Sequence, residues 1–129
     1  VNGTYAYIVV PGVTKIDKKA MQQLKIWHNT PALQAVEHQG MATIQAVFHQ
    51  SGTYQIGAWS IEVDKPVILQ ITKGDRAFKL DVADPLQQEK ALSIHLINIS
   101  AKVNQTVEIK LPQAEYAGST VSETIMAGN

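Results

Sequence analysis

Cysteine is absent from the 129 residues, and the chain has a single arginine, Arg76. Without cysteine there are no disulfides, no thiolate catalysis, no iron–sulfur clusters and no cysteine-ligated zinc. The 11 basic and 11 acidic residues cancel, so the long-range attraction to phosphate on which nucleic-acid binders rely is missing. No apolar run approaches the roughly 20 residues that span a bilayer. From these absences we expect that the chain binds neither nucleic acid nor a membrane.

What the chain does contain is a hydrophobic content of 45% and a period-two alternation of apolar and polar residues. The composition is typical of one folded globular domain. The alternation is typical of half-buried antiparallel strands, and turn residues such as Ser51-Gly52 and Asp84-Pro85 separate the segments. The alternating segments are residues 43–50, 77–82, 91–97, 106–111 and, near the end, 121–126. In the first four segments the residues predicted to face inward are Ile44, Ala46, Phe48, Phe78, Leu80, Val82, Leu92, Ile94, Leu96, Val107, Ile109 and Leu111. The predicted fold class is all-β, an antiparallel β-sandwich.

One segment near the N-terminus breaks this pattern. Residues 14–25 contain good helix formers, and Ile16, Ala20 and Leu24 lie four residues apart on one side. We predict one short helix here; a polar loop is the alternative.

The residue types that carry chemistry form no recognisable motif. His28, His38, His49 and His95 make neither an H-x-H pair nor an H-E-x-x-H helix, and we expect them to be exposed or at strand edges. There is no G-x-S-x-G turn, no G-x-G-x-x-G and no P-loop. The sequence therefore predicts no catalytic residue, no metal ligand and no cofactor.

Two pairs of carboxylates are close in sequence. Glu62 and Asp64 would share one face of a strand, and Asp81 and Asp84 flank a strand end. Either pair could give oxygen ligands to calcium. The alternative, which we favour, is that these are solvated charges at strand ends.

Aromatic and basic residues give the only candidate binding site. Tyr54 and Trp59 lie close together around Gly57, and an exposed pair of rings would form an apolar platform for a sugar. The alternative is that both rings pack in the core or against a neighbouring domain. Arg76 lies in the only local basic cluster, with Lys73 and Lys79. Tyr54, Trp59 and Arg76 are the candidate carbohydrate-binding residues.

Several segments, in order, resemble the family 8 polysaccharide lyases. The family has a Tyr-x-Tyr-x-x-x-Pro strand, then an Asn-Thr/Ser-x-x-x-Gln-Ala-Val segment, and then a Val-Ser-Asp-Pro-Thr segment. The third is matched by Leu80–Gln87, with Ala83 and Leu86 as departures. The resemblance covers about residues 4–97. The first two segments are matched by Tyr5, Tyr7 and Pro11, and then by Asn29, Thr30, Gln34, Ala35 and Val36.

The resemblance implies a division of the chain. Residues 1–12 would be the terminal strand of a preceding central β-domain, residues 13–28 a short helix and linker, and residues 29–129 a C-terminal β-sandwich domain. The implied partners are the catalytic α/α-toroid and the central β-domain of the same parent chain, with acidic polysaccharide as a further ligand. The implied location is secreted or periplasmic.

The family acts on hyaluronan, chondroitin sulfates and xanthan by β-elimination at the uronic acid. Its catalytic residues lie mainly in the toroid, and none is carried over to this chain. We therefore expect a non-catalytic structural domain, inactive alone. One alternative is a carbohydrate-binding module for acidic glycans, which the neutral net charge counts against. The other is an unrelated β-sandwich interaction domain.

Overall fold

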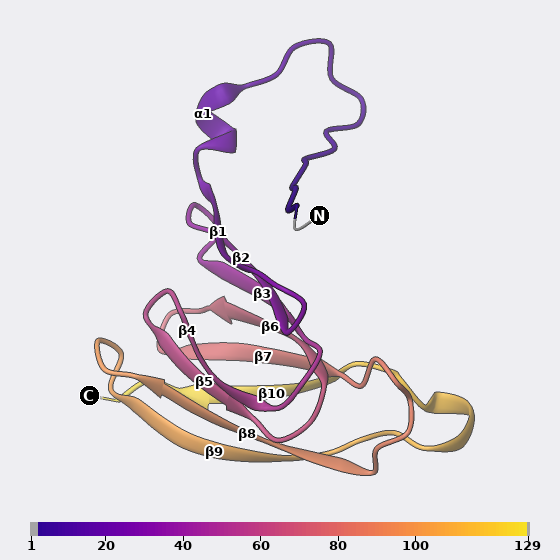
Figure 1. Ribbon diagram of the computed structural model, residues 1–129. Helices are drawn as coiled ribbons and strands as arrows, with labels where there is room; N and C mark the ends of the chain where they lie inside the picture. Colours follow the sequence, from indigo (N-terminus) through magenta and orange to yellow (C-terminus); the bar gives the residue numbers. More distant parts are fainter. Residues whose placement is uncertain (1–2, 129) are drawn as a thin grey trace.

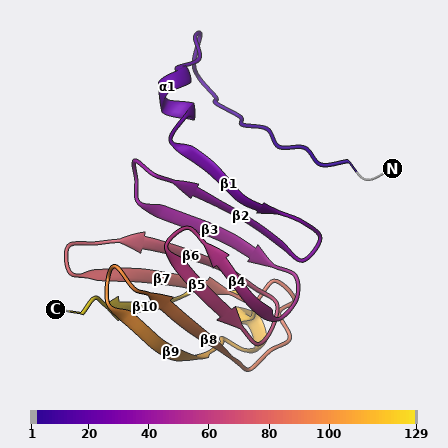
Figure 2. The same ribbon diagram turned by 60° about the vertical axis from the view of Figure 1, so that its left-hand side comes forward.

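Two antiparallel sheets packed face to face form the body of a computed structural model, which describes residues 3–128 (Figure 1). The N-terminal arm, residues 3–17, and the short helix α1 extend away from this body (Figure 2). The prediction of an antiparallel β-sandwich with one short helix near the N-terminus is confirmed.

The chain alternates between a six-stranded and a four-stranded sheet, in which all neighbouring strands are antiparallel. The six-stranded sheet has, in spatial order, β1 (Leu24–Asn29), β2 (Leu33–His38), β3 (Thr43–Phe48), β6 (Val67–Lys73), β7 (Ala77–Ala83) and β10 (Val121–Met126). The four-stranded sheet has β4 (Gly52–Ile56), β5 (Trp59–Val63), β8 (Ala91–Asn98) and β9 (Val103–Lys110). A 3₁₀ turn, η1 (Ala114–Tyr116), connects β9 to β10.

The core lies between the sheets and follows the period-two pattern. In β8, Leu92, Ile94 and Leu96 are buried, while Ser93 and His95 between them are only partly buried. Successive strand residues point to opposite faces, so the alternating apolar set of each strand enters the same core. All the apolar residues predicted to face inward from β3, β7, β8 and β9 are buried there.

The predicted helix over residues 14–25 is much shorter in the structure. Only α1 (Lys18–Met21) is helical, and it begins where the Asp17 carboxylate accepts hydrogen bonds from the Lys19 and Ala20 backbone N–H groups at 3.0 and 3.4 Å. None of its residues is buried, so no packing stabilises further turns. Leu24, which the helical pattern included, instead pairs with His38 in the sheet.

The N-terminal arm contains no helix or strand within residues 3–17. The Asn29 side-chain amide, at the end of β1, donates a hydrogen bond of 3.1 Å to the Tyr5 carbonyl of the arm. The sandwich begins at Leu24, inside the segment predicted as linker. The assignment of residues 1–12 to a preceding domain stays a prediction, and residues 1 and 2 lie outside the described residues. Within residues 3–128, no helix has the length and apolarity needed to cross a membrane.

The two-residue turn between β4 and β5 depends on Gly57, whose φ is +60°. A Cβ there would also lie 3.3 Å from Glu37 Oε1 and 3.6 Å from the Trp27 ring. We expect Gly57→Ala to lower the free energy of unfolding by about 1–2 kcal/mol, because L residues are strained at positive φ. Urea denaturation measures the loss. Gly3→Ala, at a position with no heavy atom within 4 Å, is the control and should be neutral; equal stability of both variants would contradict the prediction.

Candidate functional site

Trp59, predicted as half of an exposed sugar platform, is a core residue. Its side chain is 4% exposed, and its ring packs edge-on against Phe78 with centroids 4.8 Å apart. The prediction that Tyr54 and Trp59 form a platform of two exposed rings is therefore wrong.

The register of the β4–β5 hairpin explains this burial. Trp59 pairs with Ile56 and Tyr54 pairs with Ile61, and residues two apart on a strand share a face. Tyr54 therefore points inward as well: its ring centroid lies 5.6 Å from that of Phe48, and the side chain is half-buried. Tyr54 and Trp59 therefore both lie on the inner face of the β4–β5 hairpin and not on its exposed face.

Arg76 is exposed in the hairpin between β6 and β7. Its carbonyl accepts a hydrogen bond from the Ala127 N–H at 3.1 Å, which ties the hairpin to the end of β10. Lys73 is also exposed at this hairpin, whereas Lys79 lies further along β7 with its ammonium 3.5 Å from the Asp81 carboxylate. The predicted basic cluster is thus divided. A carbohydrate-binding role for Arg76 stays a prediction.

Each of the four histidine rings makes a hydrogen bond that fixes it to a neighbouring segment. The ring of His28 lies 2.7 Å from the Gln55 carbonyl, and His38 Nδ1 accepts from the Met41 N–H at 3.1 Å. His49 and His95 contact the side-chain oxygens of Gln34 and Asn104 at 2.6 and 2.7 Å. Within residues 3–128 there is no group of three or more histidine, cysteine, aspartate or glutamate side chains placed to hold a metal ion.

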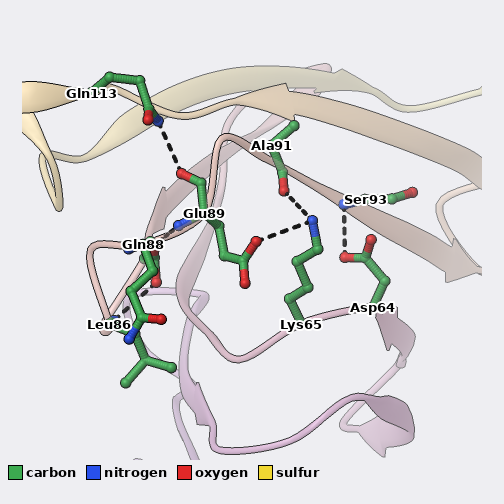
Figure 3. A network of polar contacts seen from close by, with 9 residues as sticks. Asp64, Lys65, Leu86, Gln88, Glu89, Ala91, Ser93 and Gln113 are labelled. Carbon is green, nitrogen blue, oxygen red and sulfur yellow. Dashed lines mark hydrogen bonds and ion pairs between the residues drawn. The ribbon is translucent and has the colours of Figure 1, made fainter.

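The carboxylates singled out in the sequence join neighbouring strands. Asp64 accepts from the Ser93 backbone N–H at 2.9 Å, as Figure 3 shows, and Glu62 accepts from the Thr53 hydroxyl at 3.3 Å. Asp81 accepts from the Ser122 hydroxyl at 2.6 Å. These contacts give the three groups structural roles.

Asp84 organises the loop between β7 and β8. Its two oxygens accept hydrogen bonds from the backbone N–H groups of Leu86, Gln88 and Glu89 at 2.8–2.9 Å, and the residue is 4% exposed. Burial raises the pKa of this carboxyl, but the backbone N–H groups of the loop together outweigh burial and hold the pKa below its usual 3.8. The motif Asp84-Pro85 signalled a turn in the sequence, but not this buried acceptor.

The same loop is fixed from two further sides (Figure 3). Lys65 donates to the Ala91 carbonyl at 2.7 Å and lies 3.4 Å from the Glu89 carboxylate. The Gln113 amide donates to the Glu89 carbonyl at 3.0 Å. This network therefore closes one end of the sandwich.

The N-terminal arm is the most exposed apolar segment of the described chain. Tyr5 and Tyr7 are 82% and 78% exposed, with their rings stacked at 6.2 Å, and Val9 is 73% exposed. Apart from the Tyr5 carbonyl, which accepts from Asn29, the extended backbone of residues 3–10 has no strand partner for its N–H and C=O groups. The arm therefore has the chemistry of a strand that lacks its sheet.

Comparisons with known proteins agree with this architecture. Residues 25–93, more than half of the chain, match the family profile described as polysaccharide lyase family 8, C-terminal β-sandwich domain. Chondroitinase-AC of Pedobacter heparinus is 37% identical over 123 residues, which are 93% of this chain and 18% of that protein.

Solved structures give the same result. A chondroitinase AC lyase matches with a TM-score of 0.76 at 34% identity, over 88% of this chain and 17% of that chain. A Paenibacillus xanthan lyase has a TM-score of 0.69 at 14% identity, over 85% of this chain and 12% of that one, which shows the fold alone. The chain thus spans less than a fifth of the length of these relatives. It belongs to polysaccharide lyase family 8, and it carries the C-terminal β-sandwich domain of that family.

Proposed function

We propose that this chain is the non-catalytic C-terminal part of a longer lyase, here called the parent chain, and that it supports the rest of that chain structurally. The parent chain would cleave acidic polysaccharide of the chondroitin or hyaluronan type by β-elimination. The name of the relative chondroitinase-AC, 37% identical to this chain, supports this substrate class. Such polymers lie outside the cytoplasm, so we place the parent chain in the secreted or periplasmic space.

The observation that carries the structural role is the N-terminal arm. Five of its apolar side chains are 46–82% exposed. A segment that stays free in solvent has no use for so many large apolar side chains. An extended segment of this kind gains backbone hydrogen bonds and burial when it adds to the edge of another sheet. The arm would thus be the terminal strand of the preceding central β-domain, and would anchor the sandwich to it. These five side chains are Tyr5, Tyr7, Ile8, Val9 and Val10, and two more, Val13 and Ile16, are exposed further along the arm.

Asp84, the buried carboxylate of the described chain, is unsuited to act as a general base. Proton abstraction next to a carboxylate requires a general base with a pKa near the operating pH. The pKa of Asp84 is shifted downward, away from that range, and its oxygens are bound to loop N–H groups. We place the acid–base residues in the catalytic α/α-toroid of the parent chain.

We expect the purified 129-residue chain to release no unsaturated uronide from chondroitin sulfate or hyaluronan. The measurement is ultraviolet absorbance of the product under conditions in which the Pedobacter heparinus enzyme, as the positive control, reaches completion. Circular dichroism of the same sample would establish that the sandwich is folded. Product above the rate of a heat-unfolded sample would contradict the proposal.

Glycan binding is the second candidate, and the exposure of Arg76 favours it. Trp59 contributes nothing to such a site because it is buried. The candidate glycan-binding site is therefore limited to the β6–β7 hairpin. Titration of the isotope-labelled chain with chondroitin sulfate oligosaccharides, followed by NMR, tests it. Saturable shifts confined to residues 73–77 would support binding there, and their absence at millimolar ligand would reject it.

A further inference from the structure

The outer face of the six-stranded sheet, the face turned away from the core, carries a group of partly exposed aliphatic side chains. The strand register places Ile26, Val36, Val47 and Ile68 on this face, and Leu24 joins them at the end of β1. Their exposed fractions are 37% for Leu24, 51% for Ile26, 37% for Val36 and 41% for Ile68. A shallow depression runs along the sheet over β2, β3, β6 and β7. This surface, with these five aliphatic residues, is called the outer face.

Several polar groups of the outer face are paired with one another. The Gln45 amide donates to the Gln70 side-chain oxygen at 2.7 Å. Asp81 takes the Ser122 hydroxyl at 2.6 Å and the Lys79 ammonium at 3.5 Å. Burying a polar group is costly chiefly when it loses water and gains no partner. A protein surface could therefore cover this face at a small desolvation cost.

The opposite side of the sandwich differs in composition. The strand register gives the outer side of the four-stranded sheet Glu62, His95, Glu108 and Lys110 along β5, β8 and β9. Ile97 is the aliphatic residue there, and it is half-buried. Charged residues are depleted from the centre of protein interfaces and common on solvated surfaces. The outer face of the six-stranded sheet thus has the composition of an interface, and the outer side of the four-stranded sheet has that of a solvated surface.

We propose that the outer face is the surface on which the preceding part of the parent chain packs, an inference that rests on the function proposed above. The relative chondroitinase-AC extends far beyond the matched region, which is 18% of its length. The N-terminal arm joins α1 and then β1, the edge strand of this same sheet, so a domain held by the arm starts beside the outer face.

A protein partner fits this surface better than a glycan does. The strand register places no aromatic side chain of β2, β3, β6, β7 or β10 on the outer face, and flat sugar rings usually stack on aromatic side chains. Aliphatic side chains and paired amides instead resemble the core of a protein interface, which is apolar and poor in unpaired charge.

The test uses Val36→Lys and Ile68→Lys in both the 129-residue chain and the parent chain. In the 129-residue chain both positions are partly exposed to solvent, so we expect the unfolding midpoint to shift by no more than about 3 °C. In the parent chain a lysine would be buried without a partner, so we expect limited proteolysis to release the sandwich at least about tenfold faster. Ile97→Lys, the matched aliphatic control, should have the same effect in both contexts.

Three results would overturn the inference. Unchanged release from the parent chain of both variants would mean that the face is not covered there. Saturable binding of chondroitin sulfate oligosaccharides to outer-face residues would make a glycan the occupant. Dimerisation of the parent chain that Ile68→Lys abolishes would make a second copy the occupant. Lyase activity of the unmutated parent chain is assayed in parallel. If the parent chain is inactive but its lysine variants release the sandwich faster, only the proposed function is contradicted. If the parent chain is active but its variants release the sandwich at the unchanged rate, only this inference is contradicted.

Discussion

Trp59→Ala should lower the free energy of unfolding by about 3–5 kcal/mol, the range for removing a large buried aromatic side chain. The ring is 4% exposed and its edge-to-face contact with Phe78 is lost together with its burial. This is a large fraction of the stability of a small domain. Urea denaturation followed by circular dichroism measures the loss.

The control for this variant is Tyr54→Phe, which keeps the ring that packs on Phe48. Within residues 3–128 the Tyr54 hydroxyl makes no hydrogen bond, so we expect a change of less than about 0.5 kcal/mol. If Trp59→Ala retained full stability, the ring would not belong to the core, and the sugar-platform interpretation would return.

Asp84→Ala should cost about 2–3 kcal/mol at neutral pH, because three backbone N–H groups lose a charged acceptor. The effect depends on pH. Since the pKa of Asp84 in the folded chain lies below 3.8, the ionised carboxylate stabilises the fold at pH values above 3.8. That contribution is lost as the pH falls through the lowered pKa.

The difference in unfolding free energy between the natural chain and Asp84→Ala should therefore be constant near neutral pH and shrink in strong acid. Urea denaturation from about pH 7 to about pH 2 gives this curve. Asp75→Ala, in the exposed β6–β7 hairpin, should leave stability within about 0.5 kcal/mol at every pH. A difference for Asp84→Ala that grew as the pH fell would contradict the lowered pKa.

Sequence periodicity was sufficient to predict β3, β7, β8, β9 and β10, but it was not used to predict the other strands. Alternation over residues 91–97 predicted the buried set Leu92, Ile94 and Leu96, because the side-chain direction in a strand depends only on position. The same logic failed at Leu24, where good helix formers gave a helical pattern. Pairing with β2 decided the conformation there, and tertiary pairing overrides local propensity.

The candidate binding residues were less predictable. Whether Trp59 pointed inward depended on the length of the turn at Gly57, since one residue more would have reversed its face. Asp84 was recognisable as a turn residue, but its loop is closed by Lys65 and Gln113, which come from distant segments of the chain. Contacts between distant segments have no periodic signal in one sequence.

The measurement that tests the structural role most directly is hydrogen–deuterium exchange of the backbone of residues 4–10, in the 129-residue chain and in the parent chain. In the 129-residue chain these residues form no strand, so their amides should exchange within seconds. In the parent chain they should be protected by the sheet to which the arm adds, and exchange should slow by at least about a hundredfold. Equally fast exchange in both proteins would contradict the account, because the arm would then anchor nothing.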